Sequence, residues 1–120
     1  MTPLLEVAVD DPAGVSAAIE GGADRLELCA ALEVGGLTPS FGLMRVAAGC
    51  GLPFMAMIRP RAGGFVYSEA ELAAMEADAR LAIETGAKGI VIGILTPGLK
   101  LELTAMQRMI RAAEGKEITL

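Results

Sequence analysis

The strongest constraint on the fold is a strand-like segment in which charged and apolar residues alternate, Arg25-Leu26-Glu27-Leu28-Cys29. Alternate side chains of a strand point to opposite faces, so Leu26 and Leu28 share one face. Arg25, Glu27 and Cys29 then share the other face. Such a strand is typical of a parallel sheet that packs one face against helices and turns the other toward a partly polar interior.

Other segments repeat this alternation, with Glu6 opposite the apolar residues of the first strand and Arg59 opposite those of the third. We therefore expect Glu6, Glu27 and Arg59 to point into one shared interior. A doubly wound sheet with helices on both faces would offer no polar interior, so the pattern favours a parallel barrel. Strands are expected at 4–9, 25–29, 53–60 and 89–95, and a fifth begins within 116–120.

Helix signals fall between these strands. Asp10-Asp11-Pro12 is a favourable helix start, and Ser68 with Glu71 forms a capping-box pattern. The segments 18–28 and 82–92 resemble each other, as expected if a pair of strand–helix units were duplicated. Helices are expected at 15–20, 41–50, 69–84 and 103–115.

Composition excludes several classes of function. The net charge is −5 and no segment concentrates Lys or Arg, which argues against nucleic acid as a partner. The longest apolar runs are too short to cross a bilayer, and the first residues lack the pattern of a secretion signal. Two distant cysteines and no histidine match neither a disulfide scaffold nor a zinc site. We expect a cytoplasmic protein.

Three motifs carry a resemblance to a known family: GADRLELCA at 22–30, GGLTPS at 35–40 and IRPRAGGFVYS at 58–68. In this order they resemble the CutC family, known as copper homeostasis proteins. The resemblance implies a TIM-type (β/α)8 barrel that is cytoplasmic and commonly a homo-oligomer, with a polar site at the carboxyl ends of the strands.

A complete barrel of this type takes roughly 250 residues. We therefore expect residues 1–120 to form one partial barrel domain, with the first four βα units and the start of strand five. Such an arc has exposed edges, so we expect a truncated chain, a partial gene product, or a half that associates with another half.

Glu6 and Glu27 are candidates for acid–base catalysis or metal ligation, because carboxylates that face an interior are costly unless they are paired or bonded. Arg59 is the third candidate catalytic residue. The alternative is structural, with the glutamates in ion pairs with Arg25 or Arg59.

Arg59, Arg61, Gly63 and Ser68 are candidates for an anion site. Two guanidinium groups near a glycine-containing loop and a helix start could hold a carboxylate or phosphate. The alternatives are that Arg61 is a solvated loop residue, that Arg59 neutralises the glutamates, and that Ser68 serves only as a helix cap.

Cys29 is the candidate metal ligand, because thiolates and thioethers suit Cu(I), and Met55 and Met57 could assist it. The alternative is that Cys29 is a small buried hydrophobe. The chain also departs from the family pattern, with Val66 where some relatives carry cysteine and Gly64 where many carry aspartate.

Two functions follow as hypotheses. By resemblance, the chain is a copper homeostasis protein that binds or handles Cu(I) in the cytoplasm. By residue chemistry, it belongs to a barrel enzyme, a lyase, isomerase or hydrolase, whose small anionic or sugar-like substrate is held by Arg59 and Arg61.

Overall fold

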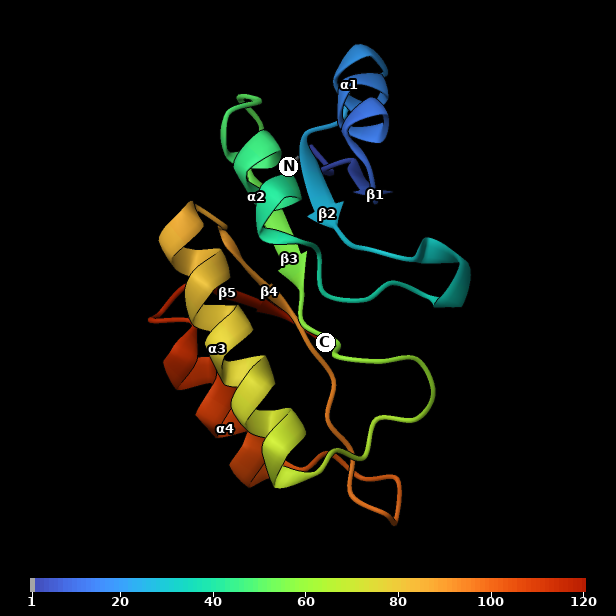
Figure 1. Ribbon diagram of the computed structural model, residues 1–120. Coiled ribbons are helices and arrows are strands. Elements are labelled where there is room, and N and C mark those ends of the chain that lie inside the picture. The colour runs from blue at the N-terminus through green and yellow to red at the C-terminus, as the bar shows by residue number, and fades with distance from the viewer. Residues whose placement is uncertain (1) are drawn as a thin grey trace.

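Five parallel strands lie side by side in chain order in the computed structural model, which describes residues 2–120 (Figure 1). Helices alternate with the strands and cover one face of the sheet. A doubly wound sheet would reverse its strand order at a switch point, whereas an unbroken order is that of an arc of a (β/α)8 barrel. The predicted fold class is confirmed. The strands are β1 Glu6–Val9, β2 Arg25–Leu28, β3 Phe54–Met57, β4 Gly89–Val91 and β5 Glu117–Thr119, and the helices are α1 Pro12–Glu20, α2 Phe41–Ala48, α3 Glu69–Thr85 and α4 Leu103–Ala112.

The helices begin where the sequence places caps. The Asp11 side chain accepts a hydrogen bond from the backbone of Gly14 at the start of α1. Ser68 and Glu71 form the predicted capping box at the start of α3. Each bond satisfies a backbone N–H that has no partner within the helix.

The strands are shorter than predicted. The segment 89–95 pairs as a strand only over β4, because β5 offers three residues to pair with. Beyond Val91 the side chains of Ile92 and Ile94 are buried, and Leu95 forms an isolated bridge with Leu101. A short 3₁₀ helix, Leu32–Val34, was not predicted in the loop after β2.

The two faces of the sheet divide their residues as the alternation predicts. Leu26, Leu28 and Phe54 pack with residues of α1 and α2 in one core cluster. Ile58 and Ile90 pack with residues of α3 and α4 in a second cluster. Both clusters lie on the helix side, and burial of these side chains is the main source of stability for such an arc.

The opposite face of the sheet carries the polar residues of the alternating strands. Glu27 is level with Ala8 on one side and Met55 on the other, and Met55 is level with Gly89. Glu27 therefore lies on the inner face, as predicted. Gly89 leaves no free space on this face, because a Cβ there would lie 2.1 Å from the Glu117 carbonyl oxygen.

Ion pairs gather at the amino ends of the strands. Arg25 Nε lies 2.5 Å from a Glu6 carboxylate oxygen, and its Nη1 lies 3.5 Å from Glu117. The amino face of a barrel is where residues serve stability rather than catalysis. None of the helices within residues 2–120 has the length and apolar character needed to span a membrane.

Candidate functional site

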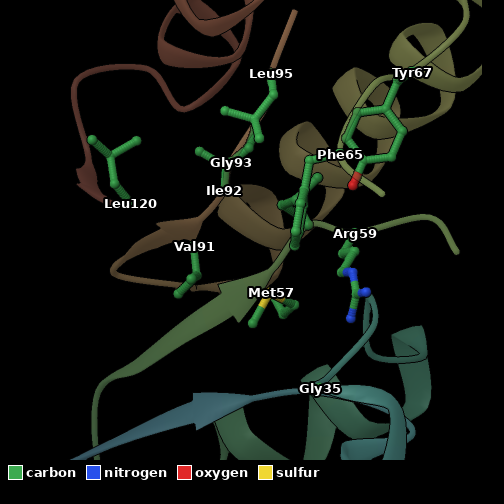
Figure 2. A pocket seen from close by; sticks show the side chains of 11 residues that line it. Gly35, Met57, Arg59, Phe65, Tyr67, Val91, Ile92, Gly93, Leu95 and Leu120 are labelled. Atoms are coloured by element: carbon green, nitrogen blue, oxygen red, sulfur yellow. The ribbon is translucent and has the colours of Figure 1, made fainter. Parts of the chain in front are cut away.

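A pocket of about 330 Å³ opens at the carboxyl ends of β3 and β4 (Figure 2). Its wall is mostly apolar, and Arg59 is its one charged residue among those that the structure describes. In barrels this end of the strands carries the binding and catalytic groups. The lining residues are Gly35, Met57, Ile58, Arg59, Phe65, Tyr67, Val91, Ile92, Gly93, Leu95 and Leu120.

Arg59 joins two loops through its terminal nitrogens. Nη1 donates to the carbonyl oxygens of Val34 at 2.7 Å and Gly36 at 3.2 Å, both in the loop after β2. Nη2 donates to the carbonyl oxygen of Gly63 at 3.0 Å, in the loop after β3. The guanidinium carbon also lies 5.1 Å from the centre of the Phe65 ring, a cation–π contact. Arg59 therefore holds the pocket's rim in place.

Two polar atoms at this pocket lack partners. Arg59 Nε and Tyr67 Oη are buried and have no hydrogen-bond partner within residues 2–120. The hydroxyl of Tyr67 points toward the Arg59 guanidinium, with the Phe65 ring beside them (Figure 2). Burial raises the pKa of the Tyr67 phenol, and the positive charges of Arg59 and Arg61, together with the close approach of Arg59 to the hydroxyl, offset part of that rise. Tyr67 is thus a neutral hydroxyl with a proton to donate.

Arg61 belongs to a separate network. Its Nε donates to the Glu71 carboxylate at 2.6 Å, and its Nη nitrogens donate to the carbonyl oxygens of Gly64 and Val66. Ser68 and Arg61 both bond Glu71, and the Ser68 backbone N–H is the main cause that lowers the pKa of this carboxyl. Arg61 and Ser68 therefore fix the conformation of the chain where α3 begins.

The predicted anion site is brought together only in part. Arg59 contacts the carbonyl oxygen of Gly63, whereas Arg61 and Ser68 converge on Glu71. Arg61 still lies against the pocket's edge, because its guanidinium carbon is 4.9 Å from the centre of the Tyr67 ring. A direct role of Arg61, Gly63 or Ser68 in ligand binding stays a prediction.

Glu6 and Glu27 lie close together on the inner face, but they do not line the pocket of Arg59. Glu6 pairs with Arg25 at the amino end of the strands. Glu27 lies level with Met55, and Arg59 lies four residues further along the same strand direction. In the described part of the chain, neither glutamate forms an ion pair with Arg59 or lines the pocket. Burial, and then the charge of Glu6, raise the pKa of Glu27.

Cys29 is buried at the carboxyl end of β2. Its thiol donates to the Glu27 carboxylate at 3.7 Å, and its Sγ lies 3.2 Å from the position of a Cβ at Gly36. Burial and the negative charge of Glu27 raise the thiol pKa to about 12. The methyl end of Met57 lies 3.5 Å from the same Gly36 position.

This donor set fits Cu(I) poorly at neutral pH. A soft metal prefers a thiolate, whereas burial and then the charge of Glu27 raise the pKa of Cys29 and keep it protonated. Over residues 2–120, no group of three His, Cys, Asp or Glu side chains is arranged to hold a metal ion. The Met57 side chain approaches the same point beside Gly36 as the Cys29 thiol.

Beside Ser68, the hydroxyl of Tyr67 can be expected at the rim of the site from the sequence, whereas nothing in the sequence marks Phe65 as a pocket residue. Both lie in a loop, where the alternation of strand residues gives no information on side-chain placement. The available signal was their position two and four residues after Gly63 in the loop after β3, since barrel sites are built from such loops.

The family model of the CutC family matches residues 3–120. Among curated proteins, the CutC family protein of Rhizobium meliloti (strain 1021) is 49% identical over 116 residues, which are 97% of this chain and 47% of that protein. The one from Pasteurella multocida (strain Pm70) is 47% identical over 116 residues, 96% of this chain and 48% of the relative. The chain spans about half the length of the curated relatives it matches.

Solved structures agree. The crystal structure of the putative copper homeostasis protein CutC from Streptococcus agalactiae superposes with a TM-score of 0.88 at 32% identity, covering 97% of this chain and 58% of that one. A putative phosphonomutase from Burkholderia cenocepacia J2315, at a TM-score of 0.58 and 19% identity, shares the fold alone. With matching motifs, strand order and relatives, the chain belongs to the CutC family and forms about half the length of such a barrel.

Proposed function

We propose that this chain supplies part of a small-molecule site in a barrel enzyme, and that the site holds an anionic ligand with an apolar body. The pocket at the ends of β3 and β4 occupies the place where barrels bind their ligands. A lyase, isomerase or hydrolase of a small acid would use such a site. The mostly apolar wall makes a sugar-like substrate a poorer match than an apolar acid.

One observation carries this proposal. Arg59 Nε and Tyr67 Oη are buried at the wall of this pocket without hydrogen-bond partners in the described chain. A buried donor left unsatisfied costs about 1–3 kcal/mol, so native proteins rarely leave two together. A ligand oxygen bound between them would recover this cost and would be attracted by the positive charge of Arg59.

A substitution that fills the pocket tests the site. Gly93 lines the pocket and a Cβ there would meet nothing within 4 Å, so Gly93→Val introduces its side chain from an open position of the pocket wall. We expect wild type to be stabilised in thermal unfolding by 3-methylbutanoate, and Gly93→Val to lose that stabilisation.

Gly64→Val is the matched control. A Cβ at Gly64 also meets nothing within 4 Å, but Gly64 lies outside the pocket. The control should respond to the acid as wild type does. Equal stabilisation of wild type and Gly93→Val would place the ligand elsewhere and remove this pocket from the proposal.

A second candidate function is Cu(I) handling. It is favoured by the approach of Cys29 Sγ and the Met57 methyl to the same point beside Gly36. It is also favoured by the name of the Streptococcus agalactiae relative, a putative copper homeostasis protein. Copper would have to displace the thiol proton, so its affinity should rise about tenfold per pH unit across the neutral range.

A competition titration with bicinchoninate between pH 6.5 and 8.5 tests this second function. Submicromolar binding with that pH slope, lost in Cys29→Ser, supports it. A Cys29→Ser variant that binds Cu(I) as tightly as wild type would exclude Cys29 as the ligand.

A further inference from the structure

We propose that Arg59 Nε and Tyr67 Oη together form a receptor for one oxygen atom, so that the ligand is a carboxylate or carbonyl compound and not a phosphate ester. This inference rests on the pocket function proposed above and narrows its substrate class. It is built on three features of the pocket: the nitrogens of Arg59 that are already bonded, the protonated state of Tyr67, and the charge of the wall.

Most N–H donors of the Arg59 guanidinium are already used. Nη1 and Nη2 already donate to three loop carbonyls, at 2.7, 3.2 and 3.0 Å, and only Nε is unpartnered. An arginine carries five N–H groups, so that of Nε and one on Nη2 remain beside the three printed bonds. Arg59 can therefore bind a ligand without breaking the bonds that hold the loops after β2 and β3. Nε is the nitrogen without any partner, and we assign it to the ligand oxygen.

Tyr67 supplies the second donor. Its hydroxyl is buried, points toward Arg59 and has no other partner within the described residues (Figure 2). Its ring is fixed by the guanidinium of Arg61, whose carbon lies 4.9 Å from the ring centre. The raised phenol pKa keeps the proton on the oxygen at neutral pH. Both donors belong to the segment between β3 and α3, and neither has a hydrogen-bond partner among the described residues.

The remaining wall limits the charge of the ligand. Met57, Val91 and Leu95 present apolar surface, and Arg59 is the one cation among the described lining residues. A phosphate monoester carries close to two negative charges at neutral pH, whereas a carboxylate carries one. The pocket balances a monoanion and would bury the second charge of a phosphate without a partner.

The same arrangement would assist a reaction at a carbonyl group. Donors that are fixed in place stabilise the negative charge that develops on an oxygen as an enolate or tetrahedral intermediate forms. Arg59 and Tyr67 would act on that oxygen, and the apolar wall would exclude water from it. The reacting compounds that suit this site are therefore small apolar acids, amides, esters or ketones.

A matched series of probes tests the receptor. 3-Methylbutanoate, 3-methylbutanamide, 3-methylbutyl phosphate and 3-methylbutan-1-ol share one branched body and differ in the polar group. Binding is followed in the complete chain by NMR of the labelled methionine methyl groups. Met57 lines the pocket, and Met109, in the core between the sheet and α4, serves as the internal reference. We expect the carboxylate to bind tightest, the amide next, and the phosphate and alcohol at least about tenfold more weakly.

The Tyr67→Phe variant tests the two-donor receptor independently of the pocket. It removes the hydroxyl and keeps the ring that packs on Arg61, so the fold should be retained. We expect about a tenfold loss of carboxylate affinity, as for one hydrogen bond to a charged group, and no change for the alcohol. If no probe shifts the Met57 signal in wild type, the pocket function itself fails. If phosphate binds as tightly as carboxylate, or Tyr67→Phe binds carboxylate unchanged, the pocket stands and the one-oxygen receptor is wrong.

Discussion

At the scale of single residues, the inner face is more specialised than its sequence suggests. The alternation predicted that Glu27 and Cys29 face the same way, and they do. It could not predict that the Glu27 carboxylate accepts a hydrogen bond from the Cys29 thiol, or that burial raises the pKa of both groups. Arg59 shows the same limit: its face was predicted, but its bonds to loop carbonyls were not.

The coupling of Cys29 to Glu27 predicts a change in thiol titration. In Glu27→Gln the negative charge beside the thiol is removed, so the thiol pKa should fall from about 12 toward its ordinary value. The midpoint is measured from the 13Cβ shift of Cys29 as pH is raised.

Glu33→Gln makes the same change on the exposed 3₁₀ helix and is the control. It should leave the Cys29 titration where wild type has it. A Cys29 midpoint that is equal in wild type and Glu27→Gln would contradict the coupling.

At the scale of elements, the sequence predicted helices better than strands. Helix starts are encoded by local caps such as Ser68 with Glu71, which form the same bonds in any surroundings. Strand lengths depend on pairing with a neighbour distant in sequence. For that reason the predicted strand 89–95 shrinks to β4, whose partner β5 pairs over only three residues.

Replacement by alanine should affect stability differently at two glycines, one in β4 and one after it. A Cβ at Gly89 would lie 2.1 Å from the Glu117 carbonyl oxygen and 2.8 Å from the Met55 methyl, so Gly89→Ala forces β5 away. We expect it to lower the free energy of unfolding by about 2 kcal/mol or more. Gly93→Ala enters open space and should change it by less than about 0.5 kcal/mol. Urea unfolding of both variants measures this, and equal stabilities would show that β4 and β5 are not packed as described.

At the scale of the whole molecule, the chain is an arc of a barrel with two distinct ends. Ion pairs such as Arg25 with Glu6 lie at the amino ends of the strands, and the pocket around Arg59 and Tyr67 lies at their carboxyl ends. The face of the sheet on which each strand residue lies and the fold class were predictable, because the period-2 alternation and the order of the strands along the chain can be recognised in the sequence. The contacts around Arg59 were not predictable, because two loops make them by meeting at one guanidinium.

The central claim is that two buried donors at the carboxyl ends of the strands bind one ligand oxygen. A crystal structure of the chain with 3-methylbutanoate tests it most directly. The account predicts one carboxylate oxygen within hydrogen-bond distance of both Arg59 Nε and Tyr67 Oη, with the branched tail against Met57. A carboxylate bound elsewhere, or a water that keeps its place between the two donors at saturating acid, would contradict it.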